Sequence, residues 1–158
     1  MNKILKISDI ESLSQIKNSG KKLVLVGGCF DILHSAHIEF LRKAKDEGDL
    51  LVVLLESDER IRMLKGKNRP VNHQKSRATV LSHLPFVDYV VMLQFMKSDL
   101  DYEILVKNLE PDIIALTAGN KVFDWERKYV EETGGRIIEV MSRMKDYSTT
   151  RIAQSIKL

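Results

Sequence analysis

Short apolar runs alternate along the chain with longer amphipathic stretches. The runs are apolar at consecutive positions, which is typical of strands in a parallel sheet that is covered on both faces. We predict five strands, at Leu23–Val26, Leu50–Leu55, Tyr89–Met92, Ile113–Leu116 and Ile137–Val140. The amphipathic stretches predict helices at Ser8–Asn18, His37–Asp46, Asp58–Met63, Gln74–Leu84, Asp101–Leu109, Asp124–Thr133 and Thr149–Lys157.

This order of elements predicts an α/β fold, a doubly wound (Rossmann-like) five-stranded parallel sheet with helices on both faces. A chain of 158 residues suits one domain with a full core and is short for two. We therefore expect a single domain over residues 1–158, with a helical lead-in at residues 1–20 and a C-terminal helix at residues 148–158. Ligands of such sheets bind beyond the carboxyl ends of the strands, so the loops there are searched for chemistry.

The loop after the first predicted strand carries two glycines and then a histidine pair, His34 and His37. Glycines let a ligand approach the backbone, and the amides at a helix start favour an anion. The i, i+3 spacing places both imidazoles on one face, where they can donate hydrogen bonds to a phosphorus centre as charge builds. An isolated pair of this kind more often caps or packs a helix. A metal pair would need a third ligand, and none of clear spacing stands nearby. The loop also lacks the G-x-G-x-x-G pattern, which disfavours a nicotinamide enzyme.

A second loop is rich in cations: Lys65, Lys67, Arg69, Lys75 and Arg77 fall within thirteen positions. Such a run is usually a solvated surface. It would also serve as a clamp that neutralises a triphosphate and an acceptor phosphate, and beside the histidine loop we favour the clamp. The net charge of the chain is only +3, so neither a nucleic-acid nor a membrane partner is implied.

Two further loops suit a nucleotide. Thr117-Ala118-Gly119-Asn120 follows the fourth predicted strand, and its small residues fit a base or ribose, or an ordinary turn. Ser148 is a natural N-cap for the last helix, and with Thr149 and Thr150 it offers hydroxyls and amides to phosphates. A simple well-capped C-terminal helix is the alternative.

Gly28-x-Phe30-Asp31-x-Leu33-His34-x-x-His37 resembles the signature of the cytidylyltransferase-like nucleotidyltransferase superfamily, which usually ends His-x-Gly-His. Ser148-Thr149-Thr150-Arg151-Ile152 is similar to the motif that closes its site. The stretch from Ser57 to Asn72 resembles the heptose 1-phosphate adenylyltransferase branch. The sequence departs at Ala36, where the superfamily has glycine, and near Asn120, where related sequences carry an acidic residue.

The resemblance implies that His34, His37 and Lys65 are catalytic and that Asp31 braces the turn. The nucleotide contacts that it implies are Gly28, Cys29, Phe30, His34, His37, Thr117, Gly119, Arg143, Ser148, Thr149 and Thr150. The acceptor or phosphate contacts are Lys65, Lys67 and Arg77. We expect no metal site in the protein, because Mg²⁺ would arrive with the nucleoside triphosphate.

The function implied is transfer of a nucleoside monophosphate from a nucleoside triphosphate, with ATP favoured, onto a phosphorylated small molecule. A heptose 1-phosphate-like acceptor is favoured among sugar and polyol phosphates. The spacing of Arg143 keeps a CTP-dependent glycerol 3-phosphate or polyol phosphate cytidylyltransferase as the alternative, and a flavin adenylyltransferase is more distant. The two departures motivate a rival, a nucleotide-binding protein of the same fold with impaired catalysis.

Composition adds an expectation about the compartment. The single cysteine rules out an intramolecular disulfide and suits a reducing environment. The first residues lack the apolar core of a signal peptide, and no apolar run approaches the roughly 20 residues that span a bilayer. We expect a cytoplasmic protein, and the resemblance implies a homodimer.

Overall fold

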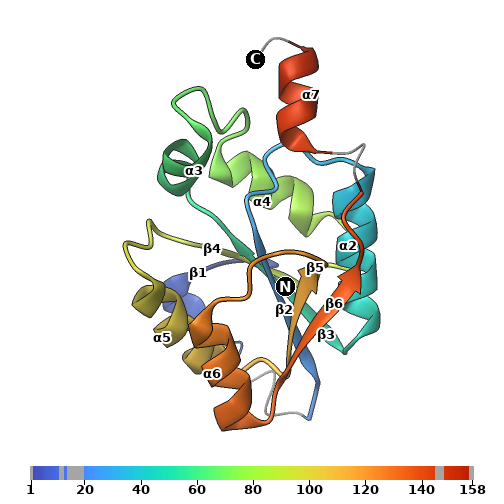
Figure 1. The fold of residues 1–158 in the computed structure, drawn as a ribbon, viewed down its shortest axis with the longest axis vertical. Coiled ribbons are helices and arrows are strands. Elements are labelled where there is room, and N and C mark those ends of the chain that lie inside the picture. The colour runs from blue at the N-terminus through green and yellow to red at the C-terminus, as the bar shows by residue number, and fades with distance from the viewer. Residues whose placement is uncertain (1, 11–12, 14–19, 145–147, 157–158) are drawn as a thin grey trace.

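The centre of the fold is a six-stranded parallel sheet (Figure 1). The computed structural model describes residues 2–10, 13, 20–144 and 148–156. The strands are β1 (Ile4–Lys6), β2 (Leu23–Gly28), β3 (Leu50–Leu55), β4 (Tyr89–Met92), β5 (Ile113–Thr117) and β6 (Arg136–Met141), in the order β1-β4-β3-β2-β5-β6. The helices are α2 (Ser35–Asp46), α3 (Asp58–Lys65), α4 (Gln74–Ser82), α5 (Asp99–Leu109), α6 (Asp124–Thr133) and α7 (Thr149–Ser155).

The prediction of five strands is wrong by one, because β1 was missed. This strand is only three residues long, follows Lys3 and ends at Lys6, so it carries no periodic signal. The segment is a strand because it pairs with β4. Ile4 pairs with Val90, and the Val90 amide donates to the Lys3 carbonyl at 2.8 Å. The helix predicted at Ser8–Asn18 lies largely outside the described residues, and the described part begins with a 3₁₀ turn at Ile7–Asp9.

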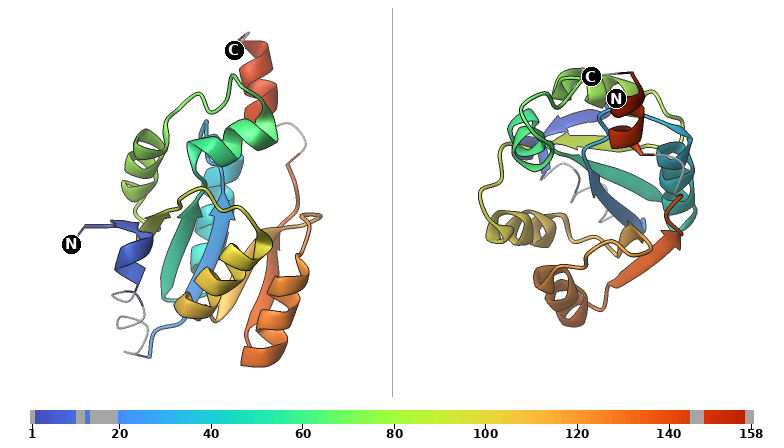
Figure 2. Two further views of the ribbon diagram at one scale, coloured as in Figure 1. Left: turned by 90° about the vertical axis from the view of Figure 1, so that its left-hand side faces the viewer. Right: turned by 45° about the horizontal axis from the view of Figure 1, so that its top comes forward.

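Each face of the sheet buries its own apolar layer, which confirms the prediction of covered strands. Alternate side chains of one strand point to opposite faces. Val24 and Val26 of β2 pack in the layer that includes residues of α2 and α4, whereas Leu23 and Leu25 pack in the layer of α5 and α6. Figure 2 shows these helices on the two sides of the sheet.

The strand order reverses at β2, which pairs with β3 on one side and with β5 on the other. This is the point at which ligands bind in doubly wound sheets. The loop into α2, the segment between α3 and α4, and α7 all stand at the carboxyl edge there (Figure 1). Among the described residues, no helix has the length and apolar character needed to cross a bilayer.

Candidate active site

A cavity of about 450 Å³ opens at the carboxyl ends of β2 and β5. This volume is within the range of small-molecule sites. The cavity brings together predicted residues from four separate loops: Gly28, Cys29, Phe30, His34, His37, Lys65, Thr117, Arg143, Ser148, Thr149 and Thr150. A larger hollow, of about 770 Å³, lies at the amino ends of β5 and β6, the edge at which such sheets do not bind ligands.

The rings of His34 and His37 stack at the start of α2, as their spacing predicted. Their centroids are 3.8 Å apart and their planes differ by 24°. His34 is the N-cap residue, with extended backbone, and His37 lies in the first turn. The ring of Phe30 meets His37 edge-on at 5.3 Å, so the pair is held from the side of the first loop.

Burial keeps both imidazoles in the neutral form. Burial and, to a smaller extent, the neighbouring His34 lower the pKa of His37 to about 4. Burial also lowers the pKa of His34. A neutral imidazole donates through one ring nitrogen and accepts through the other. The pair can therefore donate hydrogen bonds to phosphate oxygens, and a bound anion would favour its protonation.

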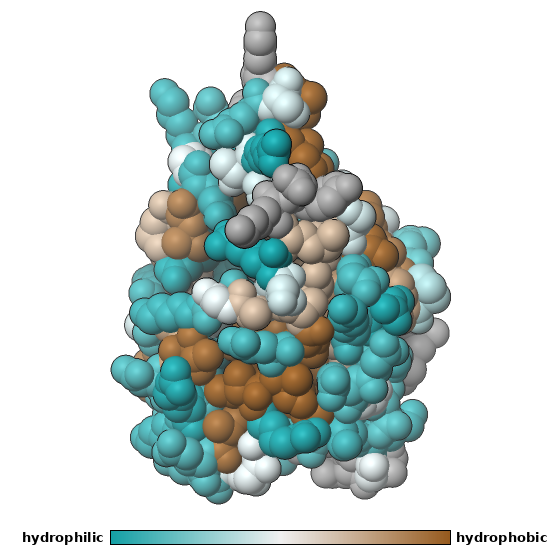
Figure 3. Space-filling model, turned by 45° about the vertical axis from the view of Figure 1, so that its right-hand side comes forward, coloured by the Kyte–Doolittle hydropathy of each residue, from teal (hydrophilic) through white to brown (hydrophobic). Residues whose placement is uncertain are grey.

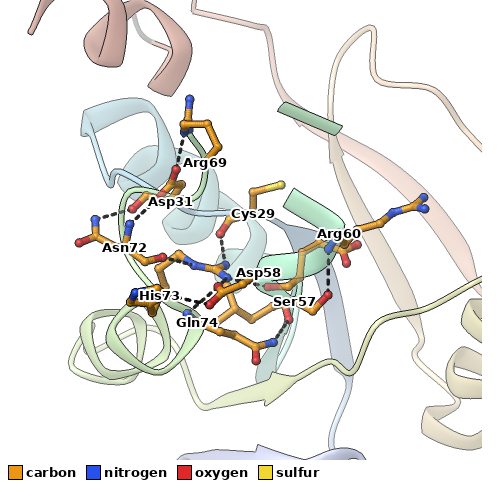
Figure 4. A network of polar contacts seen from close by, with 12 residues as sticks. Cys29, Asp31, Ser57, Asp58, Arg60, Arg69, Asn72, His73 and Gln74 are labelled. Atoms are coloured by element: carbon orange, nitrogen blue, oxygen red, sulfur yellow. Dashed lines mark hydrogen bonds and ion pairs between the residues drawn. The ribbon is translucent and has the colours of Figure 1, made fainter. Parts of the chain in front are cut away.

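Asp31 braces the first loop, as predicted. Its buried carboxylate accepts hydrogen bonds from Arg69 Nε at 2.6 Å and from the amides of Val71 and Asn72 at 3.0 and 2.9 Å. The Asn72 side chain donates back to the Asp31 carbonyl at 2.8 Å. Figure 4 shows these contacts joining the first loop to the segment before α4.

Arg77, for which a phosphate contact was predicted, does not line the cavity. Its guanidinium is buried and donates to the backbone carbonyls of Cys29, Glu56 and Asn72. It also pairs with the Asp58 carboxylate at 2.8 Å. A guanidinium committed to these partners is turned inward, so Arg77 ties three loops together at the carboxyl edge.

The two lysines of the cationic segment lie differently. Lys65, the last residue of α3, lines the cavity, whereas Lys67 is exposed and does not. Gly66 between them has φ +100°, a conformation that favours glycine and turns the chain out of the helix. Gly119 is also outside the cavity wall, but its φ of +80° forms the turn between Thr117 and Asn120, which both line the cavity.

The chain near its C-terminus closes the cavity. Ser148 caps α7 by accepting the Arg151 amide at 3.1 Å, and Thr149 Oγ1 donates to the Ile32 carbonyl at 3.2 Å. The second contact joins residues far apart in sequence and fixes α7 to the histidine loop. Arg143 is exposed at the cavity wall.

Several wall residues were missed by the sequence reasoning: Gly27, Phe40, Ala115, Leu116, Met141 and Met144. Most are apolar residues at strand or helix ends, which the pattern assigns to the core. Arg69 and Asn120, which belong to the predicted clamp and nucleotide loops, also line the cavity. Ala36, the departure between the histidines, also lines the cavity. Within the described residues, no cluster of three or more His, Cys, Asp or Glu side chains could hold a metal ion. Mg²⁺ arriving with a nucleotide stays a prediction.

Comparison with known proteins identifies similar chains. The family described as cytidylyltransferase-like matches residues 25–155. "Bifunctional protein HldE" of Campylobacter fetus is 42% identical over 156 residues, and that of Desulfatibacillum aliphaticivorans is 37% identical over 158 residues. These alignments cover 96% and 98% of this chain but only 31% of each relative, so the chain spans about a third of their length.

Two solved structures have a similar fold. The lipopolysaccharide core biosynthesis protein of Thermoplasma volcanium superposes with a TM-score of 0.62 and is 29% identical, over 82% of this chain and 100% of its own. Pantoate-beta-alanine ligase of Francisella tularensis superposes with a TM-score of 0.56, over 98% of this chain and 76% of its own. At 17% identity, the second likeness shows the fold alone.

Proposed function

Because the chain belongs to the cytidylyltransferase-like family of nucleotidyltransferases, we propose that it transfers a nucleoside monophosphate onto a sugar or polyol phosphate. The donor is a nucleoside triphosphate, with ATP favoured, and pyrophosphate is released. One observation carries the proposal: a single cavity gathers the stacked histidines, Lys65, Arg143 and the hydroxyls of Thr149 and Thr150.

The transfer is a direct displacement. An oxygen of the acceptor phosphate attacks the α-phosphorus, the bond from that phosphorus to the bridging oxygen breaks, and pyrophosphate leaves with the electron pair. Chemistry of this kind depends on positioning and charge stabilisation, so no covalent enzyme intermediate is required. His34 and His37 donate hydrogen bonds to the α-phosphate oxygens as negative charge builds there. Lys65 and Arg143 neutralise the flanking phosphates, and Mg²⁺ enters as part of the nucleotide substrate.

A heptose 1-phosphate-like acceptor is supported by the middle of the chain, where the sequence resembles the heptose branch. The Thermoplasma structure, named for lipopolysaccharide core biosynthesis, is consistent with a sugar phosphate as acceptor. Ala36, at the cavity wall, favours the rival function, a protein that binds nucleotide without turnover.

The test is pyrophosphate release from ATP or CTP with three acceptors: heptose 1-phosphate, glucose 1-phosphate and glycerol 3-phosphate. We expect the fastest release from ATP with heptose 1-phosphate. Faster release from CTP with glycerol 3-phosphate would establish the alternative. Nucleotide binding by calorimetry without release from any pair would establish the rival.

A further inference from the structure

An acid beside the cavity has no part in the transfer described above. Glu56 directly follows β3, and its amide donates to the Gly28 carbonyl at 3.1 Å, so it stands at the same carboxyl edge as the histidine loop. Its two carboxylate oxygens lie 2.9 and 3.0 Å from the hydroxyl of Tyr102, on α5. The side chain is half-buried. Burying a carboxylate costs free energy, and one hydroxyl offsets only part of that cost. A bracing role alone is therefore a poor explanation for Glu56.

The surroundings of Glu56 combine polar groups with flat rings. The guanidinium of Arg60 lies 5.9 Å from the centre of the Tyr102 ring. Its Nε is buried and has no hydrogen-bond partner in the part of the chain that the structure describes. The ring of Trp125 lies nearly parallel to that of Tyr102, with centroids 6.4 Å apart. A few converging polar groups beside aromatic surface are typical of a small-molecule site, and these can pair with hydroxyls as donors or acceptors.

Cys29 connects this group of side chains to the cavity, whose wall it forms in part. Burial raises the pKa of its thiol and the Glu56 carboxylate raises it further, whereas Lys65 lowers it. Lys65 lines the same cavity as Cys29, and the Glu56 amide bonds the carbonyl of Gly28, the residue before Cys29. In Figure 4 the sulfur points to the side of Arg60 and away from Asp31. If Lys65 binds the phosphate of a ligand, the remainder of that ligand therefore lies over Cys29 and extends towards Glu56.

Space for such a ligand exists at the end of β2. Gly27 lines the cavity, and a Cβ placed on it would meet no atom within 4 Å. Leu23 and Leu25, at alternate positions before Gly27, face α5 and α6, as do Val52 and Leu54 before Glu56. The open space is therefore on the same face of the sheet as the Glu56 side chain.

The charges give the ligand a direction. A phosphate is repelled by a carboxylate and attracted by an ammonium group, so the phosphate end belongs at Lys65. Burial raises the pKa of Glu56, whereas the Tyr102 hydroxyl and the Arg60 guanidinium lower it, so protein groups already supply the positive charge beside the carboxylate. The end of the ligand at Glu56 and Tyr102 is accordingly an uncharged one that carries hydroxyls.

We propose that Glu56 and Tyr102 form the part of the acceptor site that binds the hydroxyl groups of the sugar or polyol phosphate. Arg60 and Trp125 border this subsite, and Cys29 forms its boundary with the cavity. The two residues set acceptor specificity and do not touch the reacting atoms. This proposal rests on the proposed function, because it assigns a place to that function's acceptor.

The test compares Glu56→Gln and Tyr102→Phe with two matched controls. Glu103→Gln removes a carboxylate from α5 itself, and Tyr129→Phe removes a hydroxyl that bonds the Pro111 carbonyl away from the cavity. The measurements are the KM for heptose 1-phosphate and for ATP, and the inhibition constant of methyl phosphate, which has a phosphate but no hydroxyls. We expect the KM for heptose 1-phosphate to rise about tenfold or more in both site variants. The KM for ATP and the inhibition constant of methyl phosphate should stay near the wild-type values in both site variants. In the two control variants, all three constants should stay near those values.

An unchanged KM for heptose 1-phosphate in both site variants overturns the proposal. If the variants are then also less stable to urea than the wild type, the role of the two residues is structural. If the wild type releases no pyrophosphate with any substrate pair, the proposed function fails. Calorimetry with heptose 1-phosphate then decides this inference separately. Weaker binding by Glu56→Gln than by the wild type supports it, whereas equal binding, or none by either protein, overturns it.

Discussion

The stacked rings of His34 and His37 stay neutral in the absence of ligand because burial lowers the pKa of each. A neutral pair costs less to bury than two cations 3.8 Å apart would. Its hydrogen-bond donors become more effective when negative charge accumulates on a phosphate that both rings contact. The contribution of the two histidines to catalysis is this stronger hydrogen bonding to the negative charge that develops on the phosphate.

Replacing His34 with alanine should lower kcat by about 10²-fold or more, because one transition-state donor is lost. The KM for ATP should change much less. His83→Ala, at an exposed histidine of the same chain, is the matched control and should keep the wild-type rate. Steady-state pyrophosphate release measures all three proteins, and a wild-type rate in His34→Ala would refute the mechanism.

The stability of the protein should depend on pH through His37. Its pKa falls from the usual 6.5 to about 4 on folding, so the unfolded chain binds more protons between these values. The stabilisation by the neutral ring is therefore complete above pH 6.5 and is lost as the pH falls towards 4, by about 3 kcal/mol. Urea unfolding at several pH values measures this, and His37→Gln should show a flatter profile. An equally steep profile in the variant would assign the effect to other groups.

Ala36→Gly should lower the dissociation constant of the nucleotide about fivefold, because it removes a methyl group from the cavity wall at the helix start. The variant restores the residue usual in the superfamily. Titration of nucleotide binding by calorimetry gives the measurement, with Ala44→Gly, at a buried position in the last turn of α2, as a control for the helix effect of glycine. An unchanged affinity would mean that the nucleotide clears the methyl group.

At the scale of elements, the site depends on loops that are fixed to one another. Asp31 fastens the first loop to the segment before α4, and Arg77 fastens the first loop, the turn after β3 and the same segment. Thr149 adds α7. Hydrogen bonds to charged and buried groups stabilise more than exposed ones, so these contacts restrict the loops that carry the histidines and Lys65.

Arg77→Lys should therefore lower kcat/KM at least tenfold and the free energy of unfolding by about 2 kcal/mol or more. A lysine keeps the charge but cannot bond three carbonyls and a carboxylate at once. Arg42→Lys, at an exposed arginine of α2, should change neither quantity appreciably. Urea unfolding and steady-state kinetics test this together. Wild-type values in Arg77→Lys would show that its contacts are dispensable.

At the scale of the whole molecule, the two apolar layers pack the helices against both faces of the sheet. This packing fixes the positions of the strand ends that form the carboxyl edge. Figure 3 shows one outer face, where hydrophilic residues surround several apolar areas. Leu51 of β3 is fully buried in one of the two layers, whereas Leu100 of α5 is 59% exposed.

Leu51→Ala should lower the free energy of unfolding by about 2–5 kcal/mol, because it leaves a cavity in the packed layer. Leu100→Ala should change it by no more than about 0.5 kcal/mol. Urea denaturation monitored by the fluorescence of Trp125 compares the two. A small effect of Leu51→Ala would mean that the layer repacks around the gap.

The sequence alone determined the central strands, most helices and the family, because each rests on local information. Apolar runs set the strands, turn and cap residues set their ends, and the motif around His34 and the motif at Ser148 are contiguous. It could not give β1, whose three residues become a strand only through pairing with β4. The tertiary structure alone decided which cations face the cavity: Lys65 does, whereas Arg77 is turned inward by carbonyls from three loops. It also brought Glu56 and Tyr102 together across 46 positions. The direction of a side chain depends on partners distant in sequence, and no local pattern carries that information.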